Sequence, residues 1–184
     1  MSGKDLHFNS TILILPGLGN SGEGHWQTLW EKEFGFIRVE QHEWDTPVSE
    51  DWISTLHQSI LSFNPEEVIL VGHSLACATI VLWASRYNLK IKGALLVAPS
   101  DVDAPSYPEG TKGFKPMPVV KLPFPTITVT SNNDFYVTIS RAKQFAEGWG
   151  SELVNVGDAG HINVASGFGK WSDGLAILKR LDSL

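Results

Sequence analysis

Two kinds of hydrophobic pattern alternate along the chain. Short apolar runs are typical of strands buried on both faces, and they occur at 11–15, 36–39, 68–71, 94–98, 126–130 and 152–156. Helical periods or Ala- and Leu-rich runs lie between them, at 26–34, 52–63, 75–87, 139–149 and 175–184, and Pro65 is expected to end the second. Strands that alternate with helices favour parallel pairing, so we expect a three-layer α/β/α fold with a mostly parallel sheet of about six strands.

The stretch between Pro99 and Pro125 breaks this alternation. It holds seven of the ten prolines and shows no clear period. A long irregular loop in a small domain is usually functional or mobile. Two interpretations stay open, a minimal lid over the carboxyl ends of the strands and a rigid surface loop braced by its prolines. Since nothing else is left over to form a cap, we expect an open, shallow site.

Length and charge restrict the class of protein. The 184 residues predict a single domain over 1–184, and the net charge of −6 argues against nucleic acid as a partner. The single cysteine excludes an internal disulfide. The longest nearly apolar run, 75–84, is about half of a membrane span, and residues 1–7 lack the apolar core of a signal peptide. We therefore expect a soluble, cytoplasmic protein with no membrane partner.

Ser74 is the candidate nucleophile. It directly follows the apolar run 68–71 and precedes the predicted helix 75–87, which is the strand–turn–helix context of a nucleophile elbow. The sharp turn strains the serine backbone, exposes the hydroxyl above the sheet and requires small residues two positions before and after it. Those positions hold Gly72 and Ala76, so the motif is G-x-S-x-A in place of G-x-S-x-G.

A serine hydroxyl needs a base and an acid that orients the base. His161 is the only histidine after Ser74, in a glycine-containing loop just past the last predicted strand. Three carboxylates follow strands in the required chain order: Asp101 and Asp103 after the fourth strand, and Asp134 after the fifth. We favour Asp134, because its loop is short, polar and directly precedes a helix.

The glycine-rich loop after the first strand has two interpretations. Its glycines let the backbone approach a ligand, so the N–H of Leu18 and the N–H of Leu75 are candidates for an oxyanion hole. Its spacing also fits a dinucleotide fingerprint, with Glu40 as the later acidic residue; the glycines concerned are Gly17, Gly19 and Gly22. The dinucleotide interpretation leaves the serine and histidine unexplained, so we expect no cofactor.

Several aromatic residues are candidates for the wall of a substrate pocket. His25 and Trp26 open the first helix near the glycine-rich loop, and Phe168 and Trp171 follow His161, although packing in the core explains all four equally well. His73 is expected to point away from the nucleophile, without a second catalytic role. The six histidines include no pair four residues apart and no H-E-x-x-H motif, so we expect no metal site.

Taken together, these segments resemble the retinoblastoma-binding protein 9 / YdeN-like serine hydrolases, in the family's order and over almost the whole chain. The matching blocks are ILPGLGNS at 14–21, HW at 25–26, GHSL at 72–75, ND at 133–134, GHIN at 160–163 and GFGKW at 167–171. The resemblance implies a small, nearly lidless α/β-hydrolase fold and a triad of Ser74, Asp134 and His161. It also implies hydrolysis of small acyl esters or amides.

These observations predict a serine hydrolase of small carboxylic esters, with amides and peptides as further substrate classes. A small-molecule acyl substrate is the expected partner. The alternative is a protein-interaction module that keeps the hydrolase fold with little or no turnover, and a protein partner cannot be identified from the sequence.

Overall fold

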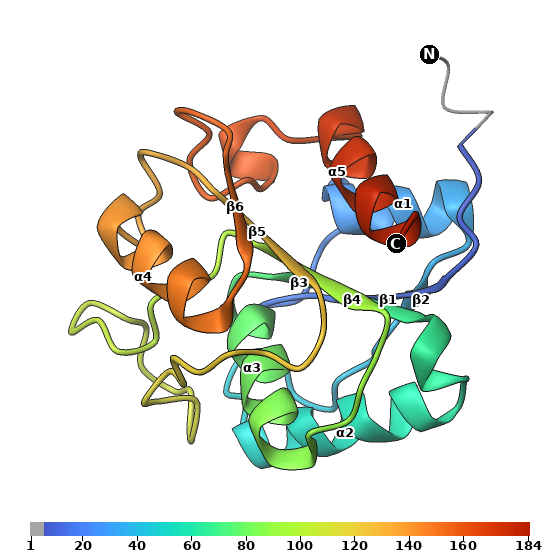
Figure 1. Ribbon diagram of the computed structural model, residues 1–184. Helices are drawn as coiled ribbons and strands as arrows, with labels where there is room; N and C mark the ends of the chain where they lie inside the picture. Colours follow the sequence, from blue (N-terminus) through green and yellow to red (C-terminus); the bar gives the residue numbers. More distant parts are fainter. Residues whose placement is uncertain (1–5) are drawn as a thin grey trace.

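A computed structural model describes residues 6–184 and contains one six-stranded sheet (Figure 1). The strands are β1 (Thr11–Leu15), β2 (Ile37–Arg38), β3 (Val68–His73), β4 (Gly93–Val97), β5 (Thr126–Thr130) and β6 (Glu152–Asn155). They lie in the order β2-β1-β3-β4-β5-β6, and every neighbouring pair is parallel. All residues of β3, β4 and β5 are buried, as expected for strands covered on both faces.

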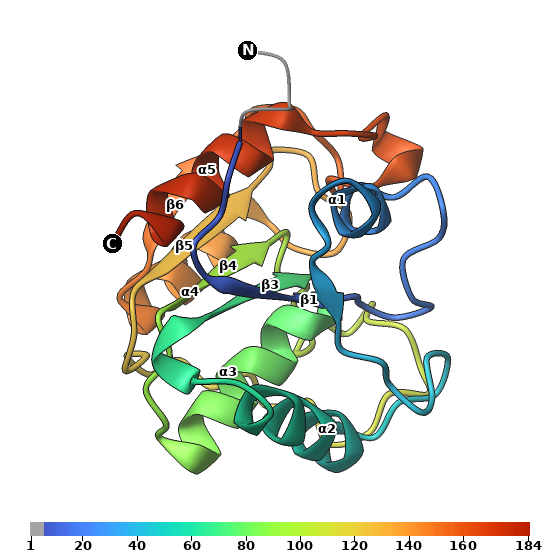
Figure 2. The ribbon, with the colours of Figure 1, turned by 90° about the vertical axis from the view of Figure 1, so that its right-hand side faces the viewer.

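Helices cover both faces of the sheet, which gives the predicted three-layer α/β/α arrangement. The helices are α1 (Trp26–Phe34), α2 (Ser49–Leu61), α3 (Leu75–Tyr87), α4 (Ile139–Trp149) and α5 (Ser172–Asp182), with short 3-10 helices η2 (Pro65–Glu67) and η3 (Val164–Ser166). Figures 1 and 2 show α1 and α5 on one face and α2, α3 and α4 on the other. Each face has its own apolar core, because the alternate residues of each strand point to opposite sides.

Several element boundaries differ from the sequence predictions by one to three residues, as in β2, β4, β6, α2 and α5. Pro65 does not end α2, which stops at Leu61; the proline instead begins η2, where its fixed backbone angle suits a first helical position. Strand β3 runs two residues past the apolar run, since Gly72 and His73 continue to pair with β4. Helix α5 begins at Ser172, three residues before its first predicted residue, and η3 was not predicted.

The proline-rich loop 99–125 is anchored to the body of the protein. Arg141 on α4 forms ion pairs with Asp101 and Asp103, at 3.1 and 2.6 Å. The indole nitrogen of Trp149 donates a hydrogen bond to the carbonyl oxygen of Pro118, and Phe114 is buried in the core on this face. These contacts brace the loop against the body of the protein, as the second of the two interpretations expected.

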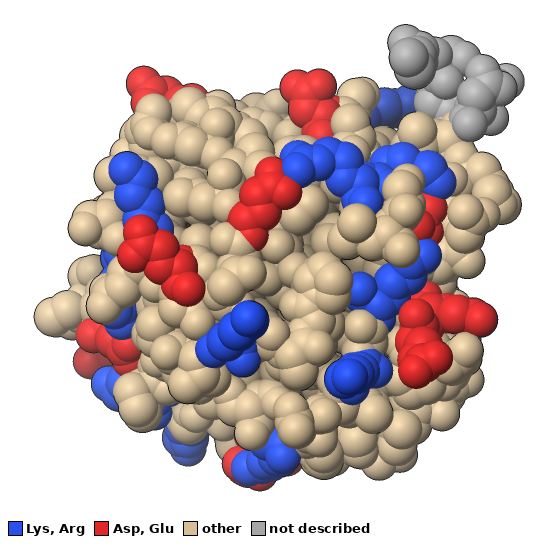
Figure 3. Space-filling model, in the orientation of Figure 1, with Lys and Arg blue, Asp and Glu red and all other residues tan. Residues whose placement is uncertain are grey.

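The surface carries charges of both signs. The face in Figure 3 has Lys and Arg side chains interspersed with Asp and Glu side chains.

Between residues 6 and 184, no helix combines the length and the apolar character that a membrane span requires. The prediction about a signal peptide concerned residues 1–7, of which 1–5 lie outside the described residues.

Candidate active site

Five loops meet at the carboxyl end of the parallel sheet and enclose a cavity of about 190 Å³, here called the site cavity. Because all strands run in the same direction, the loops that follow β1, β3, β4, β5 and β6 leave from the same edge. The lining residues are Gly17, Leu18, Asn20, His25, His73, Ser74, Tyr107, Pro108, Tyr136, His161 and Asn163.

Ser74 occupies a strained turn between β3 and α3. Its backbone angles are φ 58° and ψ −121°, which the sequence context predicted, and its N–H donates a hydrogen bond to the carbonyl oxygen of Val97 at the end of β4. The turn also explains why the residue at 72 is glycine. A β-carbon there would lie 2.7 Å from Cδ1 of Ile80 and 3.3 Å from the carbonyl carbon of Ala76. The surrounding structure therefore maintains a conformation that a serine rarely adopts.

The side chains of Ser74, His161 and Asp134 form a continuous hydrogen-bonded chain. Nε2 of His161 lies 2.8 Å from Oγ of Ser74, and Nδ1 lies 2.9 and 3.0 Å from the carboxylate oxygens of Asp134. Since a carboxylate only accepts hydrogen bonds, Nδ1 carries a hydrogen and Nε2 of the neutral ring is free to accept the serine proton. The carboxylate of Asp134 has no solvent exposure, so water does not compete for this contact.

The loops that carry Asp134 and His161 are fastened to each other. The N–H of Gly160 donates to the side-chain oxygen of Asn133 at 2.7 Å, and the N–H of Ala159 donates to Oγ of Ser131. Between the same two loops, the N–H of Asn132 donates to the carbonyl oxygen of Gly157. These contacts fix the distance between the two side chains, and the sequence reasoning had missed the part played by Asn133.

The alternative carboxylates lie elsewhere. Asp101 and Asp103 both pair with Arg141, and neither has a hydrogen bond to His161. Asp134 does not cap helix α4, because Thr138 is the N-cap residue of that helix. Oδ1 of Asp134 instead accepts the N–H of Tyr136. Of the three candidates, the structure brings only Asp134 to the histidine.

The glycine-rich loop after β1 packs directly against the serine turn. A β-carbon at Gly17 would lie 2.8 Å from the carbonyl oxygen of His73 and 2.9 Å from Cβ of Ser74, so only glycine fits there. The next residue, Leu18, lines the site cavity, and Leu75 is the first residue of α3. Within residues 6–184, neither the N–H of Leu18 nor that of Leu75 has an acceptor. Neither amide is thus already paired within this part of the chain.

This loop does not have the geometry of a dinucleotide site. Such a site needs a tight turn from strand to helix, with its last glycine packed closely between them. Here α1 begins at Trp26, well beyond the loop glycines, and β-carbons at Gly19 and Gly22 would meet nothing within 4 Å. The same described residues also contain no group of three His, Cys, Asp or Glu side chains suited to a metal ion.

Two further histidines adjoin His161. Nε2 of His73 lies 2.9 Å from the carbonyl oxygen of His161, and the His73 ring is 4.9 Å from the rings of both His161 and His25. Burial, and then the proximity of the other two histidines, holds the pKa of His73 well below its usual value. His25 caps α1 by accepting the N–H of Gln27, and burial, followed by Arg38 and His161, lowers its pKa to about 4. Both rings are therefore neutral near pH 7.

The four predicted pocket residues separate into two groups. His25 lines the site cavity, but Trp26, Phe168 and Trp171 lie outside it. Trp26 is fully buried and donates its indole N–H to the carbonyl oxygen of Ile162, and its ring packs against Trp171, which in turn contacts Phe168. These three residues therefore pack in the core between α1 and α5. The expectation that they wall the pocket is wrong for this structure.

The structure adds cavity residues that the sequence did not single out. Tyr107 and Pro108 come from the loop 99–125, which has no periodic signal, and Tyr136 stands two residues after Asp134. Asn20 and Asn163 complete the rim. For Asn20, Tyr136 and Asn163 a signal was available, because each lies within two residues of a predicted site residue.

Comparison with known proteins identifies the family. The model of the serine hydrolase family matches residues 12–180. A YdeN-like hydrolase from Pectobacterium atrosepticum has 34% identity over 94% of this chain and 90% of its own, with a TM-score of 0.83. The ydeN product of B. subtilis has 22% identity over 94% and 98% of the two chains, with a TM-score of 0.81, and so shows the shared fold. No curated protein gives a significant match. The chain therefore belongs to the serine hydrolase family and is a YdeN-like α/β-hydrolase.

Proposed function

We propose that the chain hydrolyses small carboxylic esters through an acyl-enzyme on Ser74. The observation that carries this proposal is the unbroken series of contacts from Ser74 through His161 to Asp134, at 2.8 and 2.9 Å. Membership of the serine hydrolase family supports the reaction class. The small site cavity, below the several hundred Å³ typical of drug-sized ligands, supports small substrates.

In the proposed mechanism, Oγ of Ser74 attacks the ester carbonyl carbon while Nε2 of His161 takes the serine proton. The carbonyl electron pair moves onto oxygen and gives a tetrahedral intermediate. When this collapses, the carbon–oxygen bond to the alcohol breaks, and His161 gives its proton to the departing oxygen. A water molecule, deprotonated by the same nitrogen, then releases the acid and restores Ser74. Asp134 holds the ring in the required tautomer and stabilises its positive charge.

The negative oxygen of the intermediate is assigned to the amides of Leu18 and Leu75. Both N–H groups lack acceptors within residues 6–184, and the N–H of Leu75 also benefits from the positive end of the α3 dipole. Donors fixed in place before the reaction stabilise developing charge without reorganising during it. In this proposal no cofactor or metal takes part. The likeness to retinoblastoma-binding protein 9 stays a prediction.

The test is hydrolysis of para-nitrophenyl butyrate by the purified chain and three variants. We expect Ser74→Ala to lose activity by several orders of magnitude, and Asp134→Asn to lower kcat by about 10⁴-fold, because the amide favours the wrong histidine tautomer. Asp101→Asn is the matched control, since its partner is Arg141, and it should change kcat little.

Two results would overturn the proposal. If Asp101→Asn lowers kcat as much as Asp134→Asn does, the acid is wrongly assigned. If the folded wild-type chain hydrolyses no short-chain ester, amide or peptide, the alternative of an interaction module on a hydrolase fold replaces the enzyme.

A further inference from the structure

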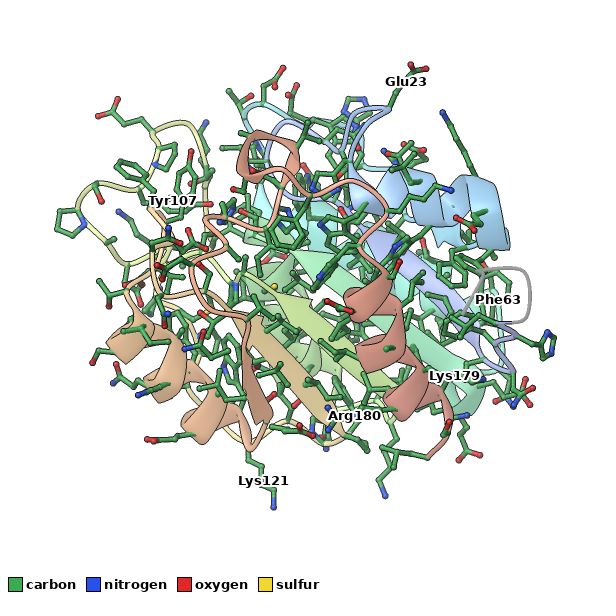
Figure 4. All side chains as sticks on the ribbon, turned by 90° about the horizontal axis from the view of Figure 1, so that it is seen from above. Glu23, Phe63, Tyr107, Lys121, Lys179 and Arg180 are labelled. Atoms are coloured by element: carbon green, nitrogen blue, oxygen red, sulfur yellow. The ribbon has the colours of Figure 1, made fainter. Side chains whose placement is uncertain are left out.

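Two hydroxyl groups lie next to the nucleophile without a part in the mechanism above. Oγ of Ser100 is 3.5 Å from Oγ of Ser74 and 3.5 Å from the hydroxyl oxygen of Tyr107. Ser100 follows the end of β4 and is 1% exposed, while Tyr107 lies on the irregular loop beyond β4 (Figure 4) and lines the site cavity. The pair, here called the Ser100–Tyr107 hydroxyls, thus joins a buried hydroxyl beside Ser74 to a hydroxyl on a residue that lines the site cavity.

Neither hydroxyl is well satisfied by the protein. Hydrogen bonds between hydroxyl groups are normally 2.5–3.0 Å long, so contacts of 3.5 Å are weak. Burying a hydroxyl without a good partner is unfavourable unless something else supplies one. Burial also raises the pKa of Tyr107, so its phenol keeps the hydrogen at neutral pH and can donate it. Weakly bonded hydroxyls at this place are suited to a polar atom of the substrate.

The position of the pair relative to His161 identifies the part of the substrate that it faces. The leaving oxygen must lie at Nε2 of His161, which gives it a proton. The neighbours of His161 in the chain, Ala159 and Ile162, belong to the core under α1 and α5. Tyr107 packs against the other core, under α2, α3 and α4. Tyr107 and the His161 loop thus pack on different faces of the sheet, and we assign the hydroxyls to the acyl side of the ester.

The rest of the cavity wall restricts the acyl group further. Among the described residues that line the site cavity, none is Lys, Arg, Asp or Glu, and both non-catalytic histidines are held neutral. The volume of about 190 Å³ lies below the several hundred Å³ typical of drug-sized ligands, which favours a small acyl group. The cavity is therefore suited to a short, uncharged acyl group with a polar atom.

We propose that the Ser100–Tyr107 hydroxyls determine acyl specificity by hydrogen bonding to a hydroxyl or carbonyl oxygen close to the ester carbonyl. The preferred substrates are then short esters of hydroxy or keto acids rather than esters of plain fatty acids. This inference rests on the proposed function, since it concerns the same acyl-enzyme. A site that hydrogen-bonds a polar atom of its substrate discriminates against an analogue without that atom, because the analogue leaves a buried polar group unpaired.

The test compares three esters with one leaving group, para-nitrophenyl butyrate and the two enantiomers of para-nitrophenyl β-hydroxybutyrate. For the wild-type chain we expect kcat/KM to be about tenfold higher for one hydroxy ester, the effect of one good neutral hydrogen bond. In Tyr107→Phe and in Ser100→Ala this ratio should fall towards one. The two variants act independently on the pair, so misfolding of one still leaves the other as a test.

A matched control is available among the three tyrosines of the chain. Tyr87 lies on α3, stacked on His57 and outside the site cavity, so Tyr87→Phe should keep the wild-type ratio. A wild-type ratio near one, or a ratio that Tyr107→Phe and Ser100→Ala both leave unchanged, overturns the inference alone. If the wild-type chain hydrolyses none of these esters, the proposed function fails and the inference fails with it.

Discussion

The imidazole of His73 contacts the main chain of His161, with 2.9 Å between Nε2 of His73 and the carbonyl oxygen of His161. Because a carbonyl oxygen only accepts, Nε2 carries a hydrogen and donates it. The residue immediately before the nucleophile therefore holds the backbone of the proposed base. This relationship was not expected from the sequence, which predicted only that the His73 side chain points away from Ser74 and has no second catalytic role.

Replacing His73 should impair catalysis through the position of His161. In His73→Ala the carbonyl oxygen of His161 loses its donor, and we expect kcat to fall by about 10–100-fold with little change in KM, because small misplacements of a catalytic group have effects of this size. In His73→Gln the side-chain amide offers a replacement donor, so part of kcat should return.

Steady-state kinetics of the two variants separate positioning from a general loss of structure. If His73→Gln is as impaired as His73→Ala although both unfold at similar temperatures, the hydrogen bond is not what matters. A rise in KM at constant kcat would likewise contradict a positioning role.

Gly17 should be irreplaceable for steric reasons. A methyl group there would lie within 3 Å of the His73 carbonyl oxygen and Cβ of Ser74, so Gly17→Ala must displace the glycine-rich loop or the serine turn. We expect a loss of ester hydrolysis of at least about 10²-fold, the typical cost of losing one oxyanion donor.

Gly22→Ala is the matched control for Gly17→Ala. A β-carbon at Gly22 meets nothing within 4 Å, and hydrolysis should stay near the wild-type rate. Equal activity of the two variants would show that the loop does not need to approach the serine so closely.

The stability of the fold should decrease as the pH falls from about 7 to about 5. The pKa of His25 is about 4 in the folded chain, against an ordinary value of about 6.5, so the unfolded chain binds more protons in this range. The contribution of neutral His25 to the free energy of unfolding is therefore present above about pH 6.5 and is lost as the pH falls towards 4. Between pH 7 and pH 5, this residue should lower the free energy of unfolding by about 1–2 kcal/mol. His73 acts in the same direction.

His25→Asn isolates the contribution of His25. Asparagine keeps the N-cap hydrogen bond to the N–H of Gln27 but does not titrate in this range. Urea unfolding at several pH values should give a shallower pH dependence for the variant than for the wild-type chain. Two parallel profiles would mean that His25 does not titrate as described.

Much of the fold could be predicted because its signals are local. Strands β1 and β5 and helices α3 and α4 have the predicted bounds, since each is a continuous apolar run or a regular period that ends at a polar residue, proline or glycine. Pro65 was misplaced because proline suits the first turn of a following helix as well as the end of a preceding one. That choice depends on how the chain continues into β3, which is not a local property.

The chain order of the site residues was also informative, because parallel strands bring successive loop residues to one edge of the sheet. The walls of the cavity were not predictable in the same way. Tyr107 lies in a loop whose course is set by contacts with α4, such as the Arg141 pairs and the bond from Trp149. His25 and Trp26 are adjacent in sequence, yet one faces the cavity and the other the core. The direction in which each of these side chains points depends on tertiary packing.

Covalent labelling with a fluorophosphonate, followed by peptide mass mapping, tests most directly that Ser74 is an activated nucleophile. We predict a single adduct on Ser74 of the native chain, no adduct in Ser74→Ala, and labelling slowed by orders of magnitude in His161→Ala, which lacks the base 2.8 Å from the serine oxygen. A folded wild-type chain that stays unlabelled, or an adduct on another residue that persists in Ser74→Ala, would contradict the account.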